Sequence, residues 1–526
     1  MQSSDLALLG QTVDQVLDGL PPRISSPLWQ WETSRPAVLA ARDQHDRVCT
    51  YAEMAAHVRS ASAWLRQQGV GAGDRVLLVN ENCVGLLVLI LALSEGDAVS
   101  VVVNARLSAA ELQRIQQHCE PRLCLYFLDS HAAAVHWRSL AGGPCASEAA
   151  PGDTRLGVLA PPDPGAPLAH ASQPVAQRVC VMIYTTGTTG DPKGVMLTHR
   201  NLLYVAALTS VLRGMQPEDR IYCVLPVSHI FGLAAVFLGA LHRGASLVLA
   251  DRFDPELVFR ALHEQRISGL LGVPTMFARL LEYARNAGIT SASLPGLRYA
   301  YAGGAPLDPT IKSQTEALFG IPLLNGYGMT ESGPTICQVR FGEWLPHCGV
   351  GRPLPGLELR LCDAAGREVA PGEVGELHVR GPGVMRGYYR NPEATAAAID
   401  AEGFLNTGDL ARQDPDGQVH IVGRSKELII HSGFNVYPPE VEAAIARHPE
   451  VVFCAVIGRP VEGNEEVLAC VQTTAGSTLD EAGLQAFIRD QLAPYKRPAR
   501  ILFMDLPTAP SGKVLKHRLA ALVANS

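Results

Sequence analysis

Short apolar runs alternate with amphipathic segments between residues 75 and 128 of the chain. The runs at 75–80, 98–104 and 123–128 have the length of buried strands, and helical segments begin at Val84 and at residue 108 between them. Strands that alternate with helices in this way are typical of a largely parallel sheet with helices on its faces. The pattern therefore predicts an α/β fold built from layered sheets and helices.

The pattern changes twice further along the chain. Residues 145–177 are rich in Pro, Ala, Gly and Ser, which indicates a surface connection rather than a core element. The alternation resumes up to residue 320, and from residue 376 it gives way to shorter strand-like pieces at 375–381 and 417–423. The letters DPDG between those pieces are typical of a hairpin turn.

The last hundred or so residues indicate a separate small α+β unit. A helix is predicted at 439–448, strands at 451–458 and 466–474, a second helix at 481–492 and a last strand at 499–505. We therefore predict a large N-terminal domain over residues 1–423 and a mobile, lid-sized C-terminal domain over residues 424–526.

Length and charge narrow the possible functions. The chain has 526 residues, of which 47% are apolar and 18% charged, and its formal net charge is −7. A chain of this length holds two to four domains with ample core. No basic run stands out, which argues against an extended nucleic-acid surface.

Cysteine usage and the absence of targeting patterns indicate a cytoplasmic protein. The twelve cysteines are scattered, and the closest pair, Cys119 and Cys124, has no second pair at zinc-finger spacing. The first residues show no signal-peptide pattern, and the most apolar run, residues 84–93, is about half the length that a bilayer requires. We therefore expect no transmembrane segment.

A glycine- and threonine-rich segment, IYTTGTTGDPKGVMLTHRN at 183–201, has the composition of a phosphate-binding loop. Glycine lets backbone N–H groups approach an anion, hydroxyls donate hydrogen bonds, and Lys193 adds charge. A P-loop is excluded, because Pro192 stands at its second glycine and Gly194 at its Ser/Thr position. The alternative to a phosphate-binding role is that this segment is an ordinary surface loop.

Four later segments carry further candidate chemistry. A strand runs into glycines at 301–307, and the segment NGYGMTESGP at 325–334 carries a tyrosine ring between two glycines, a threonine hydroxyl and a carboxylate suited to Mg²⁺. In the segment 406–430, Asp409 has the chemistry of a ribose ligand, and charged residues follow at the domain boundary. Lys513 lies on a glycine-containing stretch, where a mobile positive charge could face a phosphoryl group. Each alone also fits a structural or solvated residue.

In their order along the chain and in their residues, these segments resemble the motifs of the adenylate-forming superfamily. This superfamily comprises acyl- and aryl-CoA synthetases, adenylation domains of nonribosomal peptide synthetases, and firefly luciferase. The resemblance extends from residue 49 to residue 516 and is closest to the group of 4-coumarate, chlorobenzoate and fatty acid CoA ligases. The sequence departs from the family pattern at two places. Lys516 stands where the family often has an arginine, and the proline that is usual after Asn104 is missing.

The resemblance implies a nucleotide site made of a phosphate loop, an adenine pocket and ribose ligands. Glu331 would hold Mg²⁺, and Thr330 would donate to the α-phosphate. The residues implied to bind ATP are Thr185, Thr186, Gly187, Thr188, Thr189, Gly190, Lys193, Gly304, Ala305, Pro306, Asn325, Gly326, Tyr327, Gly328, Met329, Asp409, Ile421 and Arg424.

The resemblance also assigns roles to residues outside the nucleotide site. Lys513 would bridge the substrate carboxylate and the α-phosphate, and Lys426 would be the hinge of the small domain. His229 would gate the passage between the acid pocket and the pantetheine channel, although a capped core histidine is the alternative. Gly433 and Phe434 would line the CoA channel.

The acid pocket implied by the resemblance carries no basic residue, which favours an apolar monocarboxylic acid. Gly326 and Gly328 would admit either a flat ring or the start of an alkyl tunnel, so an aryl acid is favoured, with medium or long fatty acids next. The pocket residues are Ile230, Phe231, Phe277, Ala302, Gly303, Pro334 and Thr335, together with those two glycines.

The resulting hypothesis is a two-step ligation that uses ATP, Mg²⁺ and CoA and proceeds through an acyl-AMP. One alternative is an adenylating enzyme that loads a phosphopantetheinyl carrier protein. Another is a catalytically silent member that binds a small molecule. We expect the chain to be a monomer or a homodimer.

Overall fold

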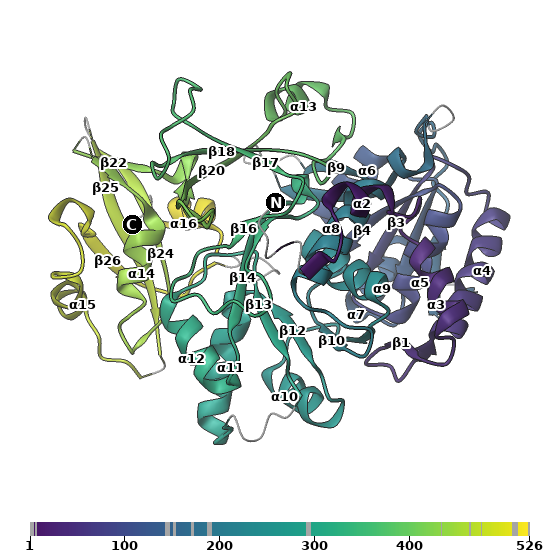
Figure 1. The fold of residues 1–526 in the computed structure, drawn as a ribbon, viewed down its shortest axis with the longest axis horizontal. Helices are drawn as coiled ribbons and strands as arrows, with labels where there is room; N and C mark the ends of the chain where they lie inside the picture. The colour runs from purple at the N-terminus through teal and green to yellow at the C-terminus, as the bar shows by residue number, and fades with distance from the viewer. Residues whose placement is uncertain are drawn as a thin grey trace.

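The computed structural model describes residues 5, 8–141, 148–150, 154–169, 173–186, 192–290, 296–432, 434–461, 464–474, 476–507 and 514–523. It has a large part built on two mixed sheets and a smaller unit beside it, which is seen at the left of Figure 1. The mixed α/β architecture predicted from the alternating pattern is confirmed.

The first sheet has nine strands in the order β16-β15-β14-β13-β12-β10-β11-β1-β2. The strands from β14 to β1 run parallel, and the strands at both ends are antiparallel to their neighbours. Their bounds are Arg352–Pro353 (β16), Thr335–Gln338 (β15), Leu323–Gly328 (β14), Tyr299–Ala302 (β13), Gly269–Gly272 (β12), Arg220–Cys223 (β10), Ser246–Leu249 (β11), Leu39–Arg42 (β1) and Val48–Thr50 (β2).

The second sheet has eight strands in the order β19-β9-β8-β4-β3-β5-β7-β6, of which β8, β4, β3 and β5 run parallel. Its three predicted strands are β3, β4 and β5, all buried. The bounds are Gly387–Tyr388 (β19), Pro192–Thr198 (β9), Val179–Thr186 (β8), Val99–Asn104 (β4), Arg75–Asn80 (β3), Leu123–Phe127 (β5), Thr154–Leu159 (β7) and Glu148–Ala150 (β6).

Helices α5 (Val84–Glu95) and α8 (His199–Leu212) share one apolar cluster with residues of both sheets. Eleven residues of α5 are buried, which accounts for the most apolar run of the sequence. Several helices begin at capping boxes, such as Thr50 with Glu53 before α4. The other helices of the large part are α2 (Val13–Asp18), α3 (Ser26–Ser34), α4 (Tyr51–Gln67), α6 (Ala109–Cys119), α7 (His131–Ala141), α9 (Gly239–Arg243), α10 (Pro255–Glu264), α11 (Pro274–Ala287), α12 (Pro309–Phe319) and α13 (Pro392–Ala398), with the π-helix η2 at Phe231–Leu238.

One expectation about residues 145–177 is wrong. Within this range β7 pairs antiparallel with β5, and Leu156 is fully buried, so part of the segment is a core strand. The interior glycine of β7 is required, since a Cβ at Gly157 would lie 2.4 Å from the indole of Trp137. Composition hid the strand because its apolar residues are few and interrupted.

A four-stranded antiparallel sheet, β17-β18-β20-β21, connects the large part to the small unit. Its strands are Glu358–Cys362 (β17), Gly375–Arg380 (β18), Leu405–Gln413 (β20) and Val419–Arg424 (β21), and the predicted DPDG hairpin joins the last two. The small unit contains β22 (Ile429–His431), β23 (Phe434–Val436), β24 (Val451–Val461), β25 (Asn464–Thr473), β26 (Arg500–Phe503), α14 (Pro438–Ile445), α15 (Glu481–Ile488) and α16 (Lys516–Val523).

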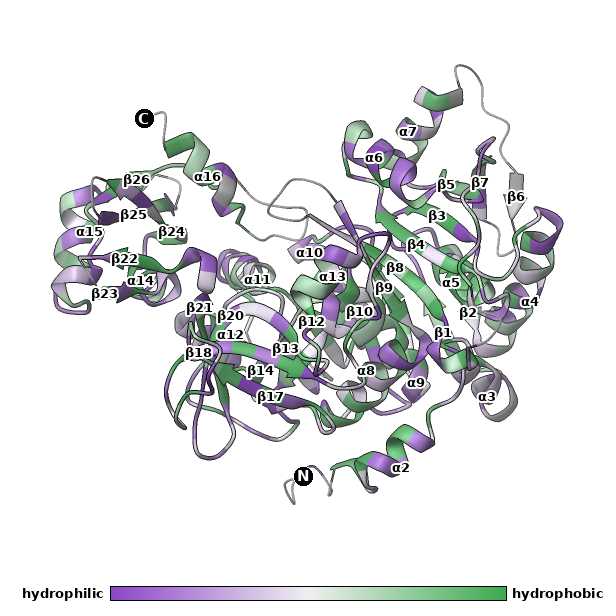
Figure 2. Ribbon diagram, turned by 90° about the horizontal axis from the view of Figure 1, so that it is seen from above, coloured by the Kyte–Doolittle hydropathy of each residue, from purple (hydrophilic) through white to green (hydrophobic). Residues whose placement is uncertain are grey.

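Hydropathy follows this arrangement. The central strands of the second sheet are predominantly hydrophobic in Figure 2, and the small unit has apolar clusters of its own, to which Val456 and Leu484 belong. No helix in the described ranges is both long and apolar enough to cross a membrane.

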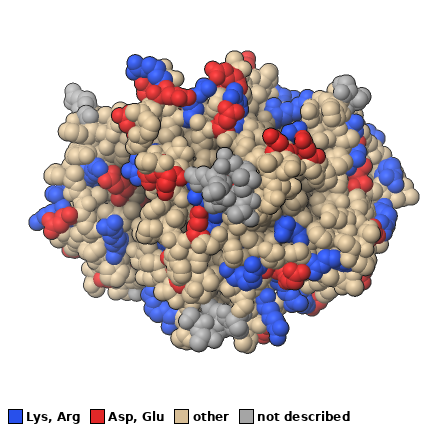
Figure 3. Space-filling model, viewed as in Figure 1, with Lys and Arg blue, Asp and Glu red and all other residues tan. Residues whose placement is uncertain are grey.

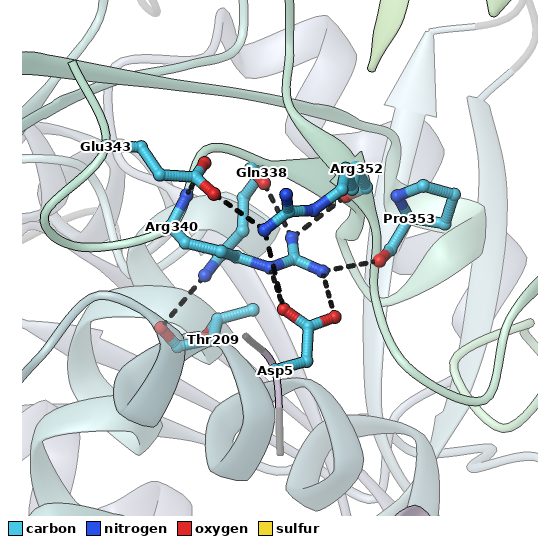
Figure 4. A network of polar contacts seen from close by, with 7 residues as sticks. All are labelled: Asp5, Thr209, Gln338, Arg340, Glu343, Arg352 and Pro353. Atoms are coloured by element: carbon cyan, nitrogen blue, oxygen red, sulfur yellow. Dashed lines mark hydrogen bonds and ion pairs between the residues drawn. The ribbon is translucent and has the colours of Figure 1, made fainter. Parts of the chain in front are cut away.

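A buried ion pair ties the N-terminal segment to strands β15 and β16 (Figure 4). The Arg340 guanidinium donates to Asp5 at 2.9 and 3.0 Å and to three backbone carbonyls, those of Gln338, Arg352 and Pro353. The Arg340 side chain is 1% exposed and that of Asp5 is 7% exposed. Every donor of this buried arginine is therefore engaged.

Candidate active site

Three of the residues predicted to bind the nucleoside meet at one carboxylate. The Tyr327 hydroxyl donates to Asp409 Oδ2 at 2.5 Å, and Arg424 Nε donates to Asp409 Oδ1 at 3.1 Å. Tyr327 lies at the end of β14, and Asp409 and Arg424 pair across β20 and β21. Burial and the Asp409 charge raise the pKa of Tyr327 far above its usual value, so its hydroxyl stays a donor.

A second group joins the predicted metal ligand to the phosphate segment. Tyr388, on β19, donates its hydroxyl to Glu331 Oε1 at 2.9 Å, and Lys193 Nζ lies 5.0 Å from the centroid of the same ring. Burial and the Glu331 carboxylate raise the pKa of Tyr388. Sequence reasoning missed Tyr388, because its position follows from the pairing of β19 with β9.

Glu331 is buried at 8% exposure, with one oxygen held by Tyr388. The described residues contain no cluster of three or more His, Cys, Asp or Glu side chains that could hold a metal ion. A single carboxylate suits Mg²⁺, which is commonly held by one or two carboxylates together with phosphate oxygens and water. The residues present therefore fit this ion only when a phosphate ligand completes the coordination.

Thr330 and Glu331 occupy a tight turn after β14, the 3₁₀ helix Thr330–Ser332. The turn is closed by Ser332 Oγ, which donates to the Pro334 carbonyl at 2.6 Å. Met329 N also donates to the Pro334 carbonyl, at 2.9 Å. The turn is thus fixed by the protein itself. The side chain of Asn325 is engaged elsewhere, since its Nδ2 donates to the Cys348 carbonyl at 3.1 Å.

At the two glycines that flank Tyr327, other groups of the protein fill the space that a side chain would take. A Cβ at Gly326 would lie 1.6 Å from the Tyr301 hydroxyl, and one at Gly328 would lie 1.7 Å from the Pro334 carbonyl. The protein itself therefore occupies the space of a side chain at both positions, and the expectation that these glycines admit a flat ring or an alkyl chain stays a prediction. At Gly326 the ring that takes the space belongs to Tyr301 on the neighbouring strand.

The predicted acid pocket is divided between two apolar clusters. Ile230 and Phe231 belong to the cluster that contains Tyr301, whereas Phe277 and Ala302 belong to another. Successive side chains of a strand point to opposite faces, so Tyr301 and not Ala302 meets Phe231, with ring centroids 6.0 Å apart. The structure thus does not bring Phe277 together with Phe231. Gly303, Pro334 and Thr335 are buried as well.

His229 and the adenine segment both lie at the surface. His229 is exposed, with Nδ1 accepting from Phe231 N at 3.3 Å, so it is not a capped core histidine. Gly304 and Pro306 are exposed and Ala305 is half-buried. Gly304 has φ of 79°, a backbone conformation that favours glycine, at the point where β13 ends.

Lys426, Ile421 and Phe434 lie on or near the small unit. Lys426 is exposed in the 3₁₀ turn Ser425–Glu427 that follows β21, and Ile421 is half-buried on β21. Phe434 is exposed and stacks on Tyr495 at 4.6 Å. Outside the described residues lie Gly187, Thr188, Thr189, Gly190, Gly433 and Lys513, and for Thr186 only the backbone in β8 is described; Thr185 is half-buried beside Lys193.

Lys516, the position where the family often has arginine, bridges two acidic residues of the small unit. Its Nζ lies 3.1 Å from Glu427 Oε2 and 2.8 Å from Glu442 Oε1. Burial alone lowers the pKa of Lys516, but the two carboxylates outweigh it and raise the pKa. The lysine therefore stays charged and links α16 to the turn that holds Lys426.

Charged side chains of both signs are interspersed over the face seen in Figure 3. They gather there in mixed groups of Lys or Arg with Asp or Glu rather than in a band of one sign.

Comparisons with known proteins extend these observations. The chain matches the model of the AMP-binding enzyme over residues 28–389 and that of the AMP-binding enzyme C-terminal domain over residues 440–513. It is 36% identical over 473 residues to the feruloyl-CoA synthase of Amycolatopsis sp, covering 89% of this chain and 92% of that protein. The 4-coumarate–CoA ligase 2 of Oryza sativa subsp. japonica is 32% identical over 93% of this chain and 90% of its own length. The structure of ATP-bound MatB from Rhodopseudomonas palustris matches with a TM-score of 0.83 at 31% identity, over 95% of this chain and 98% of that one.

Proposed function

Because this chain belongs to the AMP-binding enzyme family and is an ATP-dependent acid–CoA ligase that works through an acyl-AMP, we propose that it activates a largely apolar carboxylic acid. Aryl acids stand first and medium or long fatty acids second. Two of its relatives are named for hydroxycinnamate-type acids, feruloyl-CoA synthase and 4-coumarate–CoA ligase, which supports the aryl class.

The observation that carries the proposal is that two tyrosine-centred groups are built from the end of β14 and from the turn directly after it. Tyr327, Asp409 and Arg424 form a nucleoside site, and Glu331, Tyr388 and Lys193 form a phosphate and metal site. Residues 327 and 331 lie four positions apart, at the end of β14 and in the turn after it. A nucleoside on the first group would therefore present its phosphates to the second.

In the first half-reaction, a carboxylate oxygen of the acid forms a bond to the α-phosphorus of ATP, and the bond to the pyrophosphate oxygen breaks. Charge builds on the phosphate oxygens, where the Thr330 hydroxyl and the Lys513 ammonium would offset it. Mg²⁺ held by Glu331 would supply a further positive charge to the phosphates. Lys193, half-buried against Tyr388, is placed to assist the departing pyrophosphate.

In the second half-reaction, the CoA thiolate attacks the acyl carbonyl of the mixed anhydride and AMP leaves with the bonding electrons. We propose that the small domain, from about residue 424, turns about Lys426 between the two steps. Lys426 is exposed and lies in a short 3₁₀ turn directly after β21, which supports a pivot there. Phe434 is exposed on β23 and would then face the thiol channel.

The cellular setting is part of the proposal. All the cysteines that the structure describes are free thiols, most of them buried, which supports a reducing compartment such as the cytoplasm. Loading of a phosphopantetheinyl carrier protein is the alternative acceptor reaction. It predicts thioester formation with a carrier protein and none with free CoA.

Separate assays of the two half-reactions test the assignment. Lys513→Ala should abolish acid-dependent ATP–pyrophosphate exchange yet still convert a pre-made acyl-adenylate to the thioester with CoA. Each half-reaction serves as the control for the other, since a misfolded variant loses both. Equal loss in a variant that keeps the wild-type melting temperature would exclude Lys513 from its role. An AMP-release screen of benzoates, cinnamates and C6–C16 fatty acids would identify the acid.

A further inference from the structure

Arg213, at the end of α8, is a fully buried arginine whose guanidinium is incompletely paired. Its Nη1 donates to the Ala235 carbonyl at 3.0 Å, but Nε and Nη2 have no hydrogen-bond partner among the described residues. The two other large buried arginines differ. Arg75 donates to carbonyls through all three nitrogens, and Arg340 is paired with Asp5 and three carbonyls.

An unpaired buried guanidinium is costly, because removing a charge from water is repaid only by good partners. The ring of Tyr301 lies 4.2 Å from the guanidinium carbon of Arg213, and this cation–π contact offsets part of the cost. The Tyr301 hydroxyl is also a hydrogen-bonding neighbour of this guanidinium, but neither Nε nor Nη2 makes a hydrogen bond of good geometry within the described residues. Arg213 therefore has the capacity to bind an acceptor that the chain itself does not provide.

Two neighbouring side chains also carry unpaired polar atoms. Thr209 stands one helical turn before Arg213, and Gln338 Nε2 donates to the Thr209 carbonyl at 3.4 Å; both residues are drawn in Figure 4. Thr209 Oγ1 and Gln338 Oε1 are buried without a partner in the described structure. The three side chains, Thr209, Arg213 and Gln338, are called the polar cluster below.

The polar cluster adjoins the predicted acid pocket. Tyr301, which packs on Arg213, also meets Phe231 edge-to-face. Ala235, whose carbonyl accepts from Arg213, lies about one turn beyond Phe231 in the same π-helix. Gln338 ends β15, the strand that begins at Thr335. The cluster is therefore connected through Tyr301 and η2 to Phe231, one of the residues predicted to line the acid pocket.

We propose that the polar cluster is a subsite for an oxygen acceptor at the far end of the acid, carried on an otherwise apolar chain or ring. The inference rests on the proposed function and narrows its substrate class. The acceptor is either a ketone oxygen or a second carboxylate. With a ketone the acid has a single carboxylate, whereas a second carboxylate would also neutralise the charge of Arg213. Whether the acceptor is a ketone or a second carboxylate, Arg213 donates a hydrogen bond to its oxygen. The alkyl chain or aromatic ring of the acid would then lie beside Tyr301.

The test uses acids matched in length that differ only at the far end: octanoate, 7-oxooctanoate and octanedioate, with cinnamate, 4-acetylcinnamate and 4-carboxycinnamate as the aryl set. In the wild type, kcat/KM for acid-dependent pyrophosphate exchange should be about 10- to 100-fold higher for an oxygenated acid than for its apolar match. Comparison of the ketone acids with the dicarboxylic acids shows which kind of oxygen the subsite prefers.

Substitution of Arg213 separates binding from structure. Arg213→Met should reduce the preference to within about threefold, and Arg213→Lys should restore part of it. Because the substitution removes an unpaired buried charge, the melting temperature of Arg213→Met should equal or exceed that of the wild type. Thr209→Val is a second variant with a smaller expected loss of preference. It keeps the proposal testable if Arg213→Met does not fold.

A thermal-shift measurement reads binding without catalysis. The favoured oxygenated acid should raise the melting temperature of the wild type and leave that of Arg213→Met unchanged. Equal shifts and equal kcat/KM for matched acids, in wild type and variant alike, would mean that water satisfies Arg213 and would overturn the subsite. Failure of every acid to support pyrophosphate exchange would refute the proposed function. The thermal shifts would still decide whether the subsite binds an oxygenated acid.

Discussion

The carboxylate of Asp409 should decide how well this enzyme distinguishes ATP from 2′-deoxy-ATP. One oxygen accepts from Tyr327 at 2.5 Å and the other from Arg424 at 3.1 Å. Each carboxylate oxygen has room for about two hydrogen bonds, so one position on each oxygen remains for a ribose hydroxyl. Asp409 is 7% exposed, which keeps competing water away.

The magnitude follows from the kind of bond. A hydrogen bond to a charged acceptor contributes about 1.5–3 kcal/mol, which corresponds to roughly 10- to 150-fold in kcat/KM. We expect the wild type to prefer ATP over 2′-deoxy-ATP by a factor in this range, and Asp409→Asn to reduce the preference to a few-fold. Tyr327→Phe should give an intermediate value, because Arg424 still orients the carboxylate while the ring is kept.

The assay is acid-dependent ATP–pyrophosphate exchange with each nucleotide at subsaturating concentration. Asp414→Asn is the matched control, because Asp414 follows the same strand but pairs with His420 at 2.8 Å instead of with site residues. Its nucleotide preference should equal that of the wild type. If Asp409→Asn keeps the full preference for ATP, Asp409 does not bind the ribose and the nucleoside site is wrongly assigned.

Three further predictions concern the metal ligand, the buried ion pair and pH. Tyr388→Phe removes the hydroxyl that holds Glu331 but keeps the ring beside Lys193, so the Mg²⁺ concentration for half-maximal exchange should rise about tenfold or more; an unchanged value would contradict this role. Asp5→Ala leaves the Arg340 charge buried and should cost about 3–5 kcal/mol in thermal unfolding. Glu32→Ala, which frees the half-exposed Arg59, should cost under about 1 kcal/mol, and equal shifts would refute the contrast. Burial and the Arg243 charge lower the pKa of His242 to about 4, so stability should be full above about pH 6.5 and fall between pH 6.5 and 4, by at most about 3 kcal/mol. His242→Asn should flatten that part of the pH profile of the melting temperature, and an unchanged slope would show that another group titrates.

Local patterns were enough to predict many of the elements and to single out side chains that the structure brings into contact. The strands β3, β4 and β5 and the helix from Val84 follow from runs of apolar residues with turn residues at their ends. The same holds for the hairpin at DPDG, where Gly417 has φ of 86°. Tyr327 and Asp409, which the structure joins by a hydrogen bond, could be proposed as site residues because glycines or a charged residue mark them within a short segment. These local patterns can be read without knowing which distant residues pack against the segment.

The features that were missed depend on pairings distant in the sequence. Tyr388 and Tyr389 are adjacent tyrosines, and only the pairing of β19 with β9 decides that Tyr388 is the one that reaches Glu331. Arg213 has the sequence appearance of an ordinary charged residue at a helix end, and its burial follows from packing against η2 and β13. The two faces of β13 likewise separate Phe277 from Phe231 in a way that a list of apolar residues does not reveal.

The contact between Gly326 and Tyr301 constrains the order in which this enzyme can change its specificity. A methyl group at position 326 would overlap the Tyr301 hydroxyl, at 1.6 Å, so no larger residue is tolerated there while Tyr301 is present. Replacement of Tyr301 by a small residue would vacate that space and permit side chains at 326. The two positions should therefore vary together among descendants of this sequence, with the change at 301 coming first. A mutational library built to enlarge the acid pocket should sample them as a pair.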